Sequence, residues 1–172
     1  MDSLIERGLV LRRLQADDAA RLSDYYQSLS TQTKQRFGPH PLTPDYAMQQ
    51  CQSGLNTLTR DYFIVEHQAS IIAYFILQSE MSVHEQTRYA GQGIDLASQD
   101  DYLFAPSVAD AWQGKGLASW CMPQLLDYVK QKGARSLVLL GDTQATNPQA
   151  IAFYEKYGFK RYGGYQTEVY NH

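Results

Sequence analysis

Gln113-Gly114-Lys115-Gly116-Leu117-Ala118 is the stretch that decides the fold, because it joins an apolar run over 102–108 to a helical pattern over 116–132. Glycine lets the backbone turn tightly and lets a ligand approach it closely. The first turn of the helix directs unpaired N–H groups and the positive end of its dipole outward, which suits an anion such as a diphosphate. Glycines at such turns also serve backbone conformation alone, so the stretch indicates an anion site without identifying its ligand.

The elements after this helix alternate in type. Gly133 ends the helix, and the apolar run 136–140 predicts a strand that is buried on both faces. Asn147-Pro148 begins another helix with proline at its first position, and a final strand is expected after Phe159. The last third of the chain therefore predicts the order strand, helix, strand, helix, strand.

The first hundred residues predict three strands and two helices. The expected elements are a strand over 9–14, a helix capped by Asp17 or Asp18, a helix from Thr43-Pro44, and hairpin strands over 62–66 and 71–77. The polar stretch 80–100 has no clear period and is expected to be a loop. The whole order is β-α-α-β-β-β-α-β-α-β, which predicts a mixed α/β (α+β) fold with one sheet in a single domain over 1–172.

Composition and charge restrict the class of protein. The chain has 172 residues, of which 44% are hydrophobic, and a net charge of -3, which argues against a nucleic-acid-binding surface. No run approaches the roughly 20 apolar residues that cross a membrane, and residues 1–10 lack a signal peptide's apolar core, so a cytoplasmic protein without a membrane partner is expected. Cys51 and Cys121 show no metal-ligand spacing, and no metal is expected.

A dinucleotide-binding fold is an alternative for the glycine stretch. Gly114-x-Gly116-x-x-Ser119 nearly matches the dinucleotide fingerprint, and Asp142 stands where a ribose-binding acid is found. The third glycine is replaced by serine, however, and the unit begins only after residue 100. The remaining chain is too short for a doubly wound sheet, so this alternative is disfavoured.

Two motifs in register resemble the GCN5-related N-acetyltransferase (GNAT) superfamily. The stretch from Gln113 to Ala118 matches the pyrophosphate signature Gln/Arg-x-x-Gly-x-Gly/Ala. Asn147-Pro148-Gln149-Ala150-Ile151-Ala152-Phe153-Tyr154-Glu155-Lys156-Tyr157-Gly158-Phe159 is similar to the family's N-x-x-A-x-x-x-Y-x-x-x-G-F block. Two motifs at the family spacing are more specific than either alone. The resemblance covers residues 102–165 closely and the rest of the chain in element order, and it implies a splayed central strand pair.

The resemblance implies acetyl-CoA as co-substrate and a place for each part of it. Backbone N–H groups of the glycine stretch would bind the diphosphate, and the strand ending at Ser107 and Val108 would bond the pantetheine arm. Because Pro106 has no N–H, the backbone donor that polarises the thioester carbonyl must be Ser107 or Val108. Lys115 either adds charge to the phosphate site or is a solvated lysine. The implied cofactor residues are Ser107, Val108, Gln113, Gly114, Lys115, Gly116, Leu117, Ala118, Ser119, Asn147 and Phe153.

Acetyl transfer needs a neutral amine, a stabilised oxyanion and a proton for the leaving thiolate. Tyr154 matches the family tyrosine that supplies this proton, and its ordinary pKa near 10 keeps it protonated at neutral pH. No general base is assigned. Tyr102 occupies the strand position where some members carry one, and proton loss through water is equally compatible. Other acid or base types near expected site loops are Glu66, His84 and Glu85, each of which is otherwise a solvated surface residue.

The acceptor is expected to be a primary amine on a small molecule, peptide or protein. Phe37 and Tyr102 are the candidate acceptor-site residues, although aromatic groups there can equally pack a loop. The alternative function is an acetyl-CoA-binding sensor or degenerate family member without efficient turnover, because fold does not fix function. The sequence leaves a homodimer open and does not identify the acceptor.

Overall fold

The structure, a computed structural model, describes residues 8–52, 55, 57–97, 99–140 and 143–164. Its strands are β1 (Val10–Arg13), β2 (Arg60–His67), β3 (Ser70–Gln78), β4 (Asp101–Val108) and β5 (Ser136–Leu139). Its helices are α1 (Ala19–Ser28), α2 (Thr31–Gln35), α3 (Pro44–Gln52), α4 (Val83–Ala90), α5 (Leu117–Gln131) and α6 (Pro148–Lys156), with 3-10 turns η1 (Ala16–Asp18) and η3 (Asp110–Trp112). The expected mixed α/β fold built on one sheet is confirmed.

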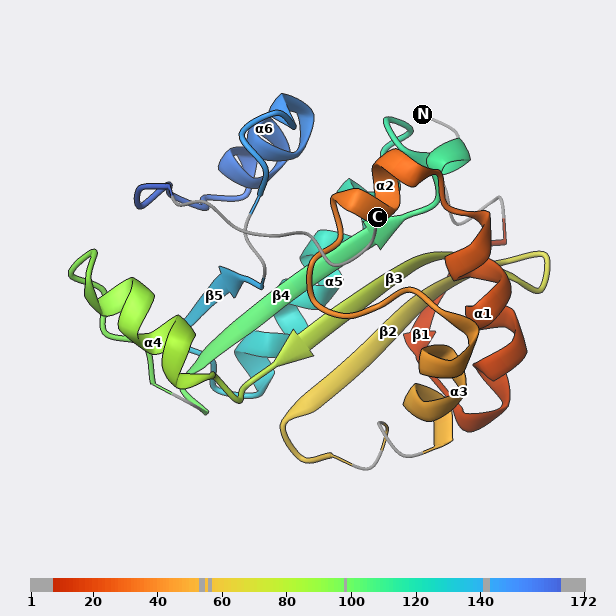
Figure 1. Cartoon of the computed structure of the whole chain (residues 1–172), viewed down its shortest axis with the longest axis horizontal. Helices are drawn as coiled ribbons and strands as arrows, with labels where there is room; N and C mark the ends of the chain where they lie inside the picture. The colour runs from red at the N-terminus through yellow and green to blue at the C-terminus, as the bar shows by residue number, and fades with distance from the viewer. Residues whose placement is uncertain (1–7, 53–54, 56, 98, 141–142, 165–172) are drawn as a thin grey trace.

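The five strands lie in the order β1-β2-β3-β4-β5, with α1 and α3 over one face and α5 over the other (Figure 1). Alternation along β3 builds both layers, because successive side chains point to opposite faces. Tyr74 and Ile76 pack in the cluster that includes α1, whereas Phe75 and Leu77 pack in the cluster that includes α5. A strand with residues buried on both faces therefore lies at the centre of the fold.

The parallel pair of β4 and β5 separates part-way along β4. Their register runs from Asp101↔Ser136 to Phe104↔Leu139, and the N–H of Leu140 donates to the carbonyl of Phe104 at 2.8 Å. Residues 105–108 pair with β3 alone among the described residues. A gap thus opens between the two strands, where the resemblance predicts a splay.

Two helices were not expected from the sequence. The stretch 80–100 was expected to be a loop, yet it contains α4, which a capping box begins. Ser82 Oγ accepts the N–H of Glu85 at 3.2 Å, and the Glu85 carboxylate accepts the N–H of Ser82 at 3.2 Å. The signal Ser-x-x-Glu was therefore present in a segment whose polarity obscured it. The second is the short helix α2, which begins at the N-cap Ser30.

Some expectations fall wholly or partly outside the described ranges. The final strand expected after Phe159 is not formed over 159–164, and residues 165–172 are not described. Residues 1–7 and Asp142 also lie outside the described part of the chain. No helix within the described ranges is long and apolar enough to cross a membrane.

A buried carboxylate joins the first strand to the first helices. Asp18 is fully buried and accepts hydrogen bonds from Arg12 at 2.7 Å and from the N–H of Gln15 at 2.9 Å. It also pairs with Arg21, which together with Arg12 reaches Glu66 on β2. Burial by itself raises the pKa of Asp18, but the hydrogen bonds and the two cations outweigh it and hold that pKa below its usual value.

Asp18→Asn is expected to lower the free energy of unfolding by about 3 kcal/mol at neutral pH, because it breaks a buried ion pair. A carboxyl whose pKa is lowered on folding stabilises the protein above its unfolded pKa and stops doing so as pH falls through the folded value. Urea unfolding at pH 7 and pH 3 should therefore show the difference from wild type shrinking in acid. Asp17→Asn, at an exposed neighbour, is the control. An equal loss in both variants would contradict this account.

Candidate active site

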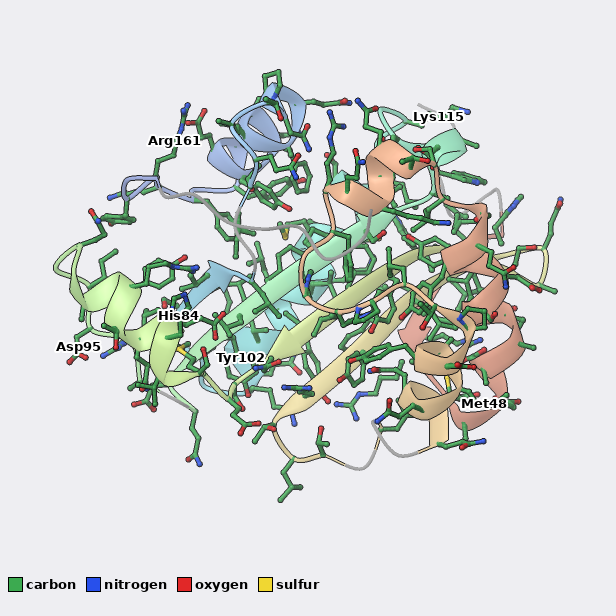
Figure 2. The ribbon with its side chains drawn as sticks, in the orientation of Figure 1. Met48, His84, Asp95, Tyr102, Lys115 and Arg161 are labelled. Atoms are coloured by element: carbon green, nitrogen blue, oxygen red, sulfur yellow. The ribbon has the colours of Figure 1, made fainter. Side chains whose placement is uncertain are left out.

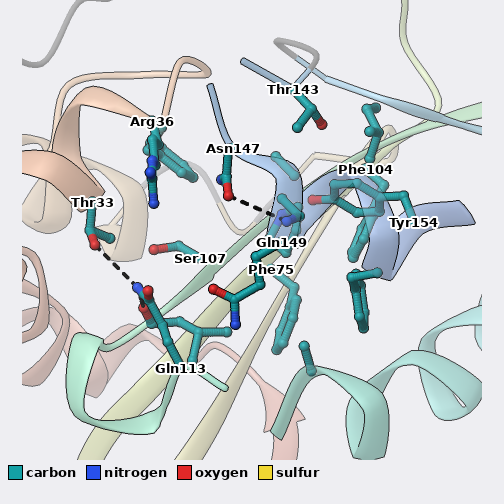
Figure 3. A pocket seen from close by; sticks show the side chains of 18 of the residues that line it. Thr33, Arg36, Phe75, Phe104, Ser107, Gln113, Thr143, Asn147, Gln149 and Tyr154 are labelled. Carbon is teal, nitrogen blue, oxygen red and sulfur yellow. Dashed lines mark hydrogen bonds between the residues drawn. The ribbon is translucent and has the colours of Figure 1, made fainter. Parts of the chain in front are cut away.

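One cavity of about 430 Å³ lies where the gap between β4 and β5 meets the start of α5 (Figure 3). Its walls come from α2 and the segment after it, β4, the glycine stretch, the first half of α5, and α6. The predicted site residues that line it are Phe37, Ser107, Val108, Gln113, Gly114, Gly116, Leu117, Ala118, Ser119, Asn147, Phe153 and Tyr154. Segments more than 100 residues apart in sequence thus meet in one cavity.

The glycine stretch has the backbone that an anion site needs. Gly116 is the N-cap of α5 with φ +84°, a left-handed conformation that other residues adopt only at a cost. The first N–H of α5 that is bonded within the helix is that of Trp120, which donates to the carbonyl of Gly116 at 2.9 Å. The N–H groups of residues 117–119 therefore have no intrahelical acceptor, and these residues line the cavity.

The splayed edge of β4 presents one backbone donor to the cavity. The carbonyl of Phe104 faces β5, whereas the N–H of Ala109 donates to Ile72 on β3 at 2.9 Å. Because backbone groups alternate in direction along a strand, 105 and 107 face β3, whereas 106 and 108 face the gap. Pro106 has no N–H, so the alternation favours Val108 over Ser107 as the donor on the open edge. The Ser107 hydroxyl is bonded to the buried Tyr25 hydroxyl at 2.8 Å.

A polar network fixes α2 beside the glycine stretch. The Asp110 carboxylate accepts the hydroxyls of Ser30 at 2.6 Å and Thr33 at 2.7 Å. Gln113 Nε2 donates both to Thr33 Oγ1 at 3.1 Å and to the carbonyl of Val108 at 2.9 Å (Figure 3). Burial raises the pKa of Asp110, but the hydrogen bonds that its carboxylate accepts from Ser30 and Thr33 outweigh burial and lower that pKa. One side chain, Gln113, therefore bonds both α2 and the residue that offers the open N–H.

Tyr154 projects from α6 into the cavity (Figure 3). Burial raises the pKa of Tyr154 above its usual value near 10, so its hydroxyl keeps its proton. None of the described residues forms a hydrogen bond with this hydroxyl. Asn147 begins the helix, because its Oδ1 accepts the N–H of Ala150 at 3.3 Å, and its amide nitrogen stays available to the cavity. α6 therefore presents a proton donor and an amide to the same space.

An unusual contact joins α6 to α5. Pro123 lies inside α5 and has no N–H to donate to the carbonyl of Ser119, four residues earlier. The hydroxyl of Tyr157 donates to that carbonyl at 3.1 Å. The carbonyl of Ser119, which Pro123 leaves without a helical donor, is therefore bonded by Tyr157, the residue directly after α6.

The acetyltransferase (GNAT) family model matches residues 22–159. The chain belongs to this family. A curated relative, N-alpha-acetyltransferase 30 of Schizosaccharomyces pombe, is 34% identical to the chain over 61 residues. The match spans 36% of this chain and 39% of that relative, so the chain matches only about two fifths of its length.

Solved structures of acetyltransferases share the fold. The GNAT domain of S. lividans PAT is 19% identical, with 92% of this chain and 85% of that chain covered and a TM-score of 0.71. The ribosomal-protein-alanine N-acetyltransferase of Brucella melitensis biovar Abortus 2308 is 13% identical, with 94% and 99% covered and a TM-score of 0.62. An aminoglycoside N-acetyltransferase, AAC(6')-Iy in complex with CoA, is 14% identical, with 92% of each chain covered and a TM-score of 0.66.

Family membership excludes the alternative of a dinucleotide-binding fold. Among the described strands, β4 and β5 form the one parallel pair, and a doubly wound sheet is mostly parallel. Membership also places the chain among acetyltransferases as a family. The roles of its individual residues remain predictions.

Two of the predicted site residues lie outside the cavity wall (Figure 2). Lys115 is exposed beside the glycine stretch. Tyr102 is buried at the start of β4, opposite Leu137, where β4 and β5 are still paired, so it packs against α5 instead of facing the gap. Its role at the acceptor site has no support from this position.

The acid and base candidates named from the sequence also lie elsewhere. Glu66 is engaged by Arg12 and Arg21, and Glu85 caps α4. His84 is exposed on α4 (Figure 2). No carboxylate or histidine is among the described residues that line the cavity. No group of three described His, Cys, Asp or Glu residues could hold a metal. Sequence reasoning missed Thr33 and Arg36, which line the cavity through α2.

Proposed function

We propose that this protein transfers an acetyl group from acetyl-CoA to a primary amine, with Tyr154 as the general acid. The observation that supports this most is that one cavity joins three features. These are the unpaired N–H groups at the start of α5, the open edge of β4 and the hydroxyl of Tyr154. Each would serve a different part of the same co-substrate.

The residues present fit acetyl-CoA. The ideal Cβ position at Gly116 has no atom within 4 Å, so the glycine leaves open space beside N–H groups that an anion can occupy. The diphosphate would bind there, contacting the backbone of the residues from Gln113 to Ser119. The pantetheine arm would lie along the open edge of β4 in the manner of an added strand, with Asn147 and Phe153 beside it.

Acetyl-CoA would supply an activated acyl carbon, and separate groups of the chain would act on its carbonyl oxygen and on its sulfur. The N–H of Val108 would stabilise the negative charge that develops on the carbonyl oxygen. As the amine nitrogen bonds to the carbon and the carbon–sulfur bond breaks, Tyr154 would donate its proton to the sulfur. The proton lost from the amine would pass to water, since no described residue lining the cavity is a carboxylate or histidine, and Tyr154 would regain its proton from water.

The proposal specifies the acceptor only as a class of compound. Similar proteins are named for an N-alpha position, for a ribosomal-protein alanine and for aminoglycosides. We propose only that the acceptor is a primary amine. Because no described residue that lines the cavity is a carboxylate or histidine able to act as general base, one rival is favoured, a sensor that binds acetyl-CoA without efficient turnover.

Release of free thiol from acetyl-CoA in the presence of a panel of primary amines tests the proposal. Amine-dependent release, with the acetylated amine detected by mass spectrometry, is the expected result. Binding of acetyl-CoA by calorimetry without release on any amine would favour the sensor. Failure to bind acetyl-CoA at all would remove both functions.

A further inference from the structure

Arg36 is the one charged side chain among the described residues that line the cavity. The rest of the wall is apolar or neutral, and no carboxylate among the described residues pairs with this guanidinium. Figure 3 shows the guanidinium pointing into the cavity, toward Ser107. Arg36 is only partly exposed, so its charge acts in a space with few compensating groups.

The position of Arg36 is fixed by α2, which ends at the residue before it. On one side, Ser30 and Thr33 of the α2 segment bond Asp110. On the other side, Gln144 Nε2 donates to the carbonyl of Gln35 at 2.8 Å. α2 therefore spans from the segment before the glycine stretch to the loop before α6, and these contacts hold the adjoining Arg36 in place.

Among the described residues, Arg36 is a guanidinium without an ion pair in an otherwise neutral cavity wall, and such a site favours an anion over a cation. Arginine donates two parallel N–H groups, which match a carboxylate or a phosphate. It would also disfavour an acceptor with several ammonium groups, because no acid on the described wall offsets its charge. The cavity is thus better suited to an acceptor that bears a negative group than to a polycation.

We propose that Arg36 selects an acceptor amine that carries an anionic group, a carboxylate or a phosphate, close to the amine. This inference rests on the proposed acetyl transfer and narrows its acceptor. The phosphates of acetyl-CoA are the competing source of the same chemistry. In Figure 3 the guanidinium points toward Ser107 on β4, beside the open strand edge where the thioester would lie, which favours the acceptor side for Arg36.

Pairs of acceptors in which one member carries an anionic group that the other lacks test the inference. The pairs are an α-amino acid with its carboxamide, and phosphoethanolamine with ethanolamine. Wild-type kcat/KM from thiol release is expected to be about 10- to 100-fold higher for the anionic member, the range of a charged hydrogen bond. Arg36→Gln should remove most of this preference by lowering kcat/KM for the anionic member. Arg36→Lys should retain part of it, because the charge stays and the two-pronged geometry is lost.

Lys34→Gln is the matched control, because Lys34 lies on α2 two residues before Arg36 but bonds the carbonyl of Gln27 and does not line the cavity. It should keep the wild-type preference. The dissociation constant of acetyl-CoA, measured by calorimetry, should stay within about twofold of the wild-type value in Arg36→Gln, because the contact that is lost is one with the acceptor and not with acetyl-CoA.

Three results would overturn the inference. Equal wild-type rates within each pair would show that no anion is selected. A weaker acetyl-CoA complex in Arg36→Gln, with both acceptors slowed alike, would assign Arg36 to the phosphates of acetyl-CoA. Absence of thiol release from wild type with every amine would remove acetyl transfer itself, which separates the failure of the proposed function from the failure of this inference.

Discussion

Gly116→Ala is expected to weaken acetyl-CoA binding about 100-fold, which corresponds to the loss of roughly two hydrogen bonds to a charged group. Gly116 has φ +84° and lines the cavity at the start of α5, so its backbone shapes the turn that exposes the N–H groups. An added Cβ would enter the space that the diphosphate would occupy and would favour a different turn. Calorimetric titration with acetyl-CoA measures the effect.

Gly133→Ala is the control for backbone strain. Gly133 follows the other end of α5 with φ +83°, its Cβ position is equally open, and it lies away from the cavity. Both variants should therefore lose a similar free energy of unfolding, about 1 kcal/mol for a left-handed alanine. Only Gly116→Ala should lose affinity. Equal affinity losses in the two variants would mean that instability, and not the anion site, causes the effect.

Tyr154→Phe is expected to lower kcat about 100-fold, the lower end of what a positioned proton donor contributes. The dissociation constant of acetyl-CoA should change little, because the ring that packs against Phe153 and Phe159 remains. Burial raises the pKa of Tyr154, so the proton-bearing form persists above pH 10. Wild-type kcat should therefore show no decline from this group up to that pH.

Tyr128→Phe is the matched control for the hydroxyl. Tyr128 lies on α5, where burial raises its pKa to about 12 and its hydroxyl donates to Asp61 at 2.8 Å, away from the cavity. This variant should lose some stability and keep kcat. A wild-type kcat in Tyr154→Phe at every pH would show that another group, or water, protonates the sulfur.

The parts of the fold predicted from the sequence depend on local signals. Glycines before α5, the Asn147-Pro148 helix start and the paired strands β2 and β3 each have a pattern within a short window. α2 has no such pattern. It is held by Asp110, 77 residues after Thr33, and only the folded chain brings these two residues together.

The candidate site was predictable where backbone chemistry defines it and unpredictable where tertiary contacts do. The glycine stretch and Tyr154 lie in motifs, and both line the cavity. Tyr102 was chosen by its position along β4, but the gap between β4 and β5 opens only beyond Phe104. Arg36 follows a five-residue helix in a polar segment, and nothing in its neighbourhood marks it as part of a cavity wall.

Acetyl-CoA is expected to lie in the gap between β4 and β5 and at the start of α5, positioned for transfer. A crystal structure of the protein with bound acetyl-CoA tests this expectation most directly. We predict the diphosphate on the N–H groups of residues 116–119 and the thioester carbonyl within hydrogen-bonding distance of the Val108 N–H. A diphosphate bound elsewhere, or a pantetheine arm lying outside the gap, would contradict the account.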